Sequence, residues 1–192
     1  MLILGVDPGL RVTGYAVVKV AAPKHALVEA GVIRLTLLHR ETKVKASVPD
    51  RLAELDTEFR ALLERLHPDV VGVEGLFAHA AHPATAMVMA HARGVLLLAI
   101  KQANLRLVEL KPRSVKKAMT GSGNAEKPQM QRAVQEYFAL PELPDPPDVA
   151  DALAIALTTA EVVTFGVSED DPEASIEHRT IAEGLAKRRR RK

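Results

Sequence analysis

Short apolar runs alternate along this chain with longer segments of helical periodicity. Three runs rich in Val, Leu and Ile come first and predict β-strands at residues 2–7, 13–20 and 26–35. Turn residues at Pro8-Gly9 and at 22–24 separate these runs. Two further runs, at 70–74 and 105–110, predict short strands that are buried on both faces.

Between and after these strands, apolar residues recur every three or four positions. Such a period predicts a helix over 50–66, which ends at His67-Pro68-Asp69. The segment 84–102 predicts a second helix that is apolar nearly all round, with Gly94 as a site of close packing. Three more helices are predicted, over 112–119, 126–138 and 149–163.

The order of the elements predicts the fold class and the domain organisation. Three strands followed by alternating helices and strands indicate an α/β fold, with a mixed sheet and helices on both faces. The 192 residues are enough for one such domain, which we place at 1–166. Beyond it the composition turns acidic at 169–173 and basic at 187–192, so we expect 167–192 to be a mostly disordered charged tail.

Composition excludes several classes of function. The chain has no cysteine, so disulfides, thiolate metal sites and cysteine catalysis are excluded. Met1 leads directly into a strand-like run, and we expect no signal peptide. The best candidate for a membrane span, residues 94–100, is too short, so we expect no membrane partner. These features together favour the cytoplasm.

The net charge of +2 conceals a strongly basic region. Residues 101–132 carry eight lysines and arginines against two glutamates, Glu109 and Glu126. A concentrated basic region on a nearly neutral protein is suited to binding a polyanion through counterion release. A solvated lysine-rich face is the structural alternative for the same window.

Four carboxylates lie at unusual positions. Asp7 and Glu74 each end an apolar strand, and Asp148 and Asp151 lie three residues apart at the start of the last predicted helix, on one face. A charge at the end of a buried strand is costly unless it is paired. Each acid also has a structural interpretation: Asp7 as a turn residue, Glu74 as a partner of an arginine, Asp148 as a helix cap and Asp151 as a helix-dipole carboxylate.

In the expected layout the strands carrying Asp7 and Glu74 are neighbours, with the last helix beside them, so the acids converge. Four close carboxylates raise one another's pKa and do not all stay ionised without cations. Hard oxygen ligands favour Mg²⁺ or Mn²⁺. Two such ions, about 4 Å apart, are a known arrangement for displacement at phosphorus.

Five segments in register resemble the RuvC family of Holliday-junction resolvases. They are Gly5-Val-Asp-Pro-Gly-Leu-Arg-Val-Thr-Gly-Tyr15, Val73-Glu-Gly-Leu-Phe77, Ala92-Arg-Gly-Val95, the stretch from Lys111 to Lys127, and Asp148-Val-Ala-Asp-Ala-Leu-Ala-Ile-Ala156. The resemblance runs over about residues 1–163. It implies a ribonuclease H-like fold with a five-stranded mixed sheet, and a metal-dependent crossover junction endodeoxyribonuclease that acts in recombination and repair.

The resemblance also implies roles for individual residues. Asp7, Glu74, Asp148 and Asp151 correspond to the family's metal-binding catalytic acids, and a histidine in some relatives at the position of Asp148 indicates a proton relay as its alternative role. Lys116 and Lys127 correspond to phosphate-contacting lysines, and Phe77 to the aromatic that engages unstacked bases. We add Arg11, Lys117 and Arg113 as DNA-binding candidates. Arg11 is also interpretable as fixing the first hairpin.

The resemblance further implies a homodimer, four-way junction DNA as substrate and a RuvAB-like branch-migration partner. We place the protein in the bacterial cytoplasm, at the nucleoid when it is bound to DNA. Three rivals remain: a fragment of an actin-like kinase, a catalytically silent junction-binding protein, and another nuclease on the same fold. The departure nearest the site is Gly75, where the family often has glutamine.

Overall fold

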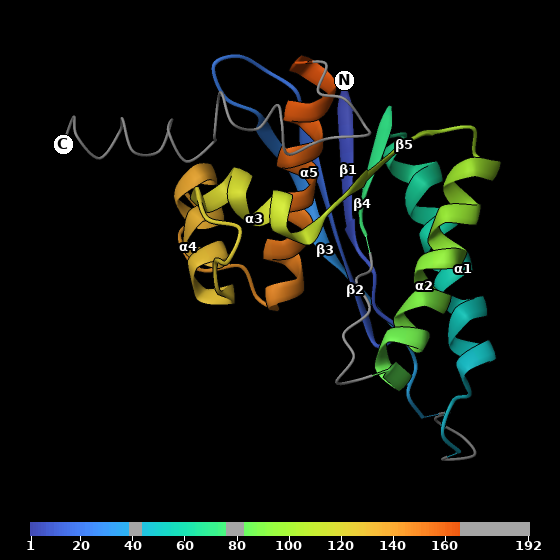
Figure 1. The fold of residues 1–192 in the computed structure, drawn as a ribbon. Helices are drawn as coiled ribbons and strands as arrows, with labels where there is room; N and C mark the ends of the chain where they lie inside the picture. The colour runs from blue at the N-terminus through green and yellow to red at the C-terminus, as the bar shows by residue number, and fades with distance from the viewer. Residues whose placement is uncertain (39–43, 76–82, 166–192) are drawn as a thin grey trace.

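The three N-terminal runs form an antiparallel meander, β1 (Leu2–Asp7), β2 (Val12–Lys19) and β3 (Ala26–Arg34). Two parallel strands, β4 (Val70–Glu74) and β5 (Arg106–Leu110), complete a five-stranded sheet of order β3-β2-β1-β4-β5. The computed structural model describes residues 1–38, 44–75 and 83–165 (Figure 1). The predicted tail after residue 166 lies outside the described residues, and so does Phe77.

Helices cover both faces of the sheet, as Figure 1 shows. One face packs against α1 (Val48–Leu66) and α2 (Pro83–Gln102), in a core that includes Phe59, Leu96 and Ile100. The other face packs against α5 (Pro147–Phe165), with α3 (Pro112–Thr120) and α4 (Lys127–Phe138) beyond it. The predicted mixed sheet with helices on both faces is therefore confirmed.

The helix α5 lies directly on the backbone of the central strands. Its residues 152–160 are all buried. A Cβ added at Gly5 of β1 would lie 2.4 Å from the carbonyl oxygen of Ala152, and one added at Gly14 of β2 would lie 2.2 Å from that of Asp148. Only glycine permits such an approach, so these two positions set how close the start of α5 comes to the sheet.

One structural alternative and one expectation about the helices are wrong. Asp148 is not the cap of α5, because the helix begins one residue earlier, at Pro147, a residue that favours the first helical position. Gly94 is not a site of close packing within the chain. It is exposed, and a Cβ added there would meet nothing within 4 Å. The outer side of α2 is instead an uncovered apolar surface, with Met87 63% and Leu98 55% exposed.

The helix α2 also bears on the expectation about membranes. Within the described residues, Ala84–Gln102 is long and apolar enough to cross a membrane, so the expectation that no stretch reaches this length is wrong by that criterion. Length and composition alone are weak evidence, because core helices of soluble proteins pass the same test. Here one side of the helix packs into the core through Ala92, Leu96 and Ile100.

Candidate active site

Two neighbouring strands deliver two carboxylates to one edge of the sheet. β1 and β4 are parallel and adjacent, with Val6 opposite Val73, and the next residues along the two strands are Asp7 and Glu74. Across β1–β2, Asp7 is opposite Gly14, on which the start of α5 rests. The first turns of α5 therefore place Asp148 and Asp151 beside the strand ends, and all four acids line one cleft of about 880 Å³.

The electrostatics of the cleft show that these acids interact. Burial, followed by the charges of Asp151, Glu74 and Asp148, raises the pKa of Asp7 well above its usual value. Burial and the charge of Asp151 raise the pKa of Glu74 to about 7, against the opposing effects of Lys116 and Lys127. The pKa of Asp151 is also raised, first by burial. Without a cation, the cleft therefore retains protons near neutral pH.

The chemistry of the donors fits a hard divalent cation, since four carboxylates supply only oxygen ligands. Across residues 1–38, 44–75 and 83–165, however, no three His, Cys, Asp or Glu side chains are grouped closely enough to hold a metal ion as they stand. The acids share a cleft without forming a closed set of ligands. A bound cation would offset the repulsion between ionised carboxylates in the cleft.

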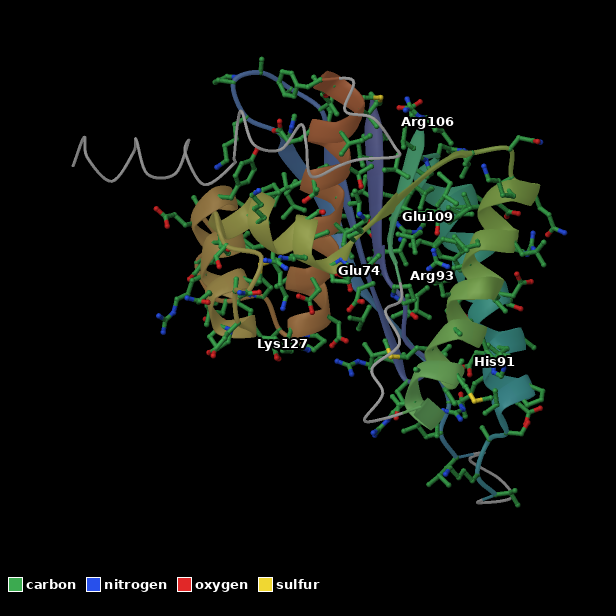
Figure 2. All side chains as sticks on the ribbon, in the orientation of Figure 1. Glu74, His91, Arg93, Arg106, Glu109 and Lys127 are labelled. Atoms are coloured by element: carbon green, nitrogen blue, oxygen red, sulfur yellow. The ribbon has the colours of Figure 1, made fainter. Side chains whose placement is uncertain are left out.

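Basic side chains line the same cleft as the acids. Lys116 of α3 and Lys127 at the start of α4 both line the cleft. Figure 2 labels Lys127 and Glu74. The Nζ of Lys127 lies 4.0 Å from Oδ2 of Asp151, although the side chain is 74% exposed. Arg11, in the turn between β1 and β2, is exposed and lines the cleft as well.

Two of the proposed DNA-binding residues lie outside this cleft. Pro112, Val115 and Lys116 line it, whereas Arg113 and Lys117, four residues apart on α3, do not. The side chain of Arg113 packs instead over Gly123, where an added Cβ would lie 2.5 Å from its Cγ. The structure therefore brings Lys116, Lys127 and Arg11 to the acids but not Arg113 or Lys117.

Sequence reasoning missed two arginines that support the site. Arg51 of α1 lines the cleft, and its guanidinium donates to the carbonyl oxygen of Leu10 at 3.0 Å. Arg93 of α2 donates from Nε to the carbonyl oxygen of Glu74 at 3.2 Å. Both act on backbone far away in sequence. The signals for Arg93 were its charge in the middle of a mostly apolar helix and its place in the family-like segment Ala92-Arg-Gly-Val95, but neither showed what it contacts.

A mixed sheet of this order, with acids at the ends of two central parallel strands and on the helix across them, defines a nuclease of the ribonuclease H-like class. The comparisons with known proteins agree. The family described as "Crossover junction endodeoxyribonuclease RuvC" matches residues 3–159, and the chain belongs to this family.

Individual relatives resemble the chain over most of its length. The RuvC protein of Rhodopirellula baltica is 42% identical over 155 residues, which cover 81% of this chain and 83% of that protein. The RuvC protein of Chloroflexus aggregans is 40% identical over 172 residues, covering 88% of this chain and 100% of that one.

A solved structure entitled "T. thermophilus RuvC in complex with Holliday junction substrate" superposes with a TM-score of 0.75 at 30% identity. The superposed region covers 86% of this chain and 96% of the chain in that structure. The kinase rival is therefore excluded by family membership, and the ribonuclease H-like expectation is confirmed.

Proposed function

We propose that this chain resolves four-way (Holliday) DNA junctions in recombination and repair, acting in the cytoplasm by paired, symmetric nicks. The observation that carries the proposal is the convergence of Asp7, Glu74, Asp148 and Asp151 in one cleft, with Lys116 and Lys127 beside them. The likeness to a RuvC protein solved with its Holliday junction substrate supports the choice of DNA. Each nick would leave a 5′-phosphate and a 3′-hydroxyl, which suits religation.

Mg²⁺ is the proposed cofactor, two ions per site, with Mn²⁺ as a substitute. Asp7 and Glu74 at the strand ends and Asp151 on α5 would hold the ions, with Asp148 as a further ligand or a proton relay. When bound, the cations supply an activated water and stabilise the leaving 3′ oxygen. The raised pKa values of Asp7, Glu74 and Asp151 mean that cations must displace protons from the cleft.

The basic residues are proposed to hold the DNA backbone. Lys116, Lys127 and Arg11 line the cleft and would contact phosphates next to the scissile bond. Lys117 and Arg113 lie outside it, so any contact they make would be with DNA arms farther from the acids. Phe77 would stack on an unpaired base at the junction, an interaction worth about 1–3 kcal/mol per base.

A homodimer is proposed because a four-way junction has approximate two-fold symmetry, so that two identical sites cut it symmetrically. The outer side of α2 is the proposed interface. Met87, His91, Gly94 and Leu98 recur at helical spacing there, and all four are exposed. An uncovered apolar helix face of this kind is typical of a protein–protein contact. A RuvAB-like branch-migration complex is the proposed further partner.

The test is cleavage of a synthetic four-way junction with Mg²⁺, comparing the wild type with Asp7→Asn. Paired symmetric nicks by the wild type, with tight binding but no cutting by the variant, would support both the carboxylate assignment and the substrate. Tight binding without cutting by either protein would indicate a junction-binding protein without catalysis. Equal cutting of linear duplex or RNA–DNA hybrid would refute the junction specificity.

A further inference from the structure

Arg93 is a mostly buried arginine that joins three elements next to the acids. Its side chain is 18% exposed, in the middle of the apolar helix α2. Nε donates to the main-chain oxygen of Glu74, the last residue of β4. NH2 donates to Oε2 of Glu109 on the neighbouring strand β5. Figure 2 shows Arg93 and Glu109 together between α2 and the strands, with Glu74 on the strand side.

The contact falls at Glu74, the last residue of β4. Beyond Glu74, the amide of Gly75 still donates to the carbonyl oxygen of Leu110, at 2.8 Å, and the described part of the strand ends there. The Glu74 carbonyl receives its hydrogen bond from Arg93, out of the helix layer. Because the backbone at residue 74 determines where the carboxylate projects, the guanidinium is placed to fix that direction.

The shape of the side chain explains why arginine is used. A guanidinium has a planar fork that donates to two acceptors at once, whereas a lysine ammonium is a compact point charge on a flexible stem. Burial lowers the pKa of Arg93, so the group is held in an environment unfavourable to charge. Glu109 is 52% exposed and supplies the compensating charge. A surface ion pair alone would need neither the buried position nor the second acceptor.

We propose that Arg93 is a positioning residue that sets the Glu74 carboxylate through its main chain and couples α2 to the active site. This inference rests on the proposed nuclease function. Arg93 belongs to α2, whose outer side is the proposed dimer interface. A partner subunit that displaced α2 would therefore also shift the Glu74 main chain, through the Arg93 side chain.

The test compares Arg93→Gln, Arg93→Lys and Glu109→Gln with the wild type. The measurements are single-turnover cleavage of a synthetic four-way junction as a function of Mg²⁺ concentration, junction binding in Ca²⁺, and thermal unfolding. We expect Arg93→Gln to bind the junction within twofold of the wild type, to cut about 10- to 100-fold more slowly, and to need more Mg²⁺ for half-maximal rate. The cleavage rate of Arg93→Lys should fall between those of the wild type and Arg93→Gln, because the lysine reaches one acceptor only.

Glu109→Gln separates the ion pair from the backbone contact. It leaves the donation from Arg93 to Glu74 in place, and its cleavage rate should stay within about threefold of the wild type. Arg60→Gln is the matched control, since Arg60 also contacts α2, at Gln102, and pairs with an acid, Asp56. It should keep both the rate and the Mg²⁺ dependence.

Two results would overturn the proposal. One is a folded Arg93→Gln that cuts at the wild-type rate with unchanged Mg²⁺ dependence. The other is an equal loss in Glu109→Gln, which would assign the effect to the ion pair. If Arg93→Gln unfolds, Arg93→Lys, which keeps the charge and the stem, decides by the same criteria. A wild type that cuts no junction at all would refute the proposed function, a result distinct from either of these.

Discussion

Gly14→Ala tests whether the closeness of α5 to the sheet controls catalysis. The new Cβ would lie 2.2 Å from the carbonyl oxygen of Asp148, whereas ordinary van der Waals contact begins at 3.4 Å. The start of α5 must therefore recede by about 1.2 Å, because the obstructing atom belongs to the backbone. Gly14 is also the cross-strand partner of Asp7, so the shift separates Asp148 from Asp7. A misplacement of about 1 Å is enough to cost about 100-fold in rate.

The assay is single-turnover cleavage of a four-way junction at saturating Mg²⁺, with urea unfolding of the same protein. We expect about a 100-fold lower rate and a loss of about 1–3 kcal/mol in the free energy of unfolding. Gly94→Ala is the control for the unfolding measurement alone, because Gly94 lies on the proposed dimer interface. Its Cβ would meet nothing within 4 Å, and it should raise helix stability by up to about 1 kcal/mol. A folded Gly14→Ala with a rate within twofold of the wild type would refute the reasoning.

Three other predictions follow from the cleft and from α2. In EDTA, the free energy of unfolding should fall by about 3 kcal/mol from pH 4.5 to 7, because folded Glu74 keeps its proton up to a pKa of about 7 while the unfolded carboxyl loses it near 4.5. Urea titrations of the wild type and Glu74→Gln check this, and an equal slope in both would contradict it. Lys127→Ala should weaken junction binding and reduce the slope of log K against log salt by about 1, measured by fluorescence anisotropy; an unchanged slope would rule out a phosphate contact. Met87→Asp should shift a dimer to a folded monomer in sedimentation, since the side chain is 63% exposed in the single chain, and a persistent dimer would place the interface elsewhere.

Much of the fold was predictable because its core strands and helices carry strong periodic signals. The strands β1 and β4 begin and end at the predicted residues, and no helix end differs from expectation by more than two residues. The start of α5 was placed too late, because a run of three prolines at 144, 146 and 147 was interpreted wholly as loop, whereas Pro147 opens the helix. The four acids were identified because each breaks an apolar pattern or begins a helix.

The sequence could not predict which way individual helix residues point, or which residues distant in sequence contact one another. Lys116 and Lys117 are adjacent in one basic helix, but successive residues point about 100° apart, so only one of them lines the cleft. The helical period of α2 showed that Gly94 is on a helix but not that it faces outward. Arg51 and Arg93 bond to carbonyl oxygens of Leu10 and Glu74, contacts between distant segments that leave no local pattern.

The burial of α5 has a consequence for how the substrate is recognised. Residues 152–160 are enclosed by the core, so a large movement of the helix carrying Asp148 and Asp151 away from the strands would break up that core. The backbone that carries the acids is thus held in place by the core. The enzyme therefore has little capacity to move its acids toward a phosphate that lies too far from them. The DNA must therefore deform to bring the phosphate to the acids. The energetic cost of that deformation is smallest where the strands already diverge from a straight duplex. Branched DNA is then favoured by its own flexibility, at positions the protein never touches.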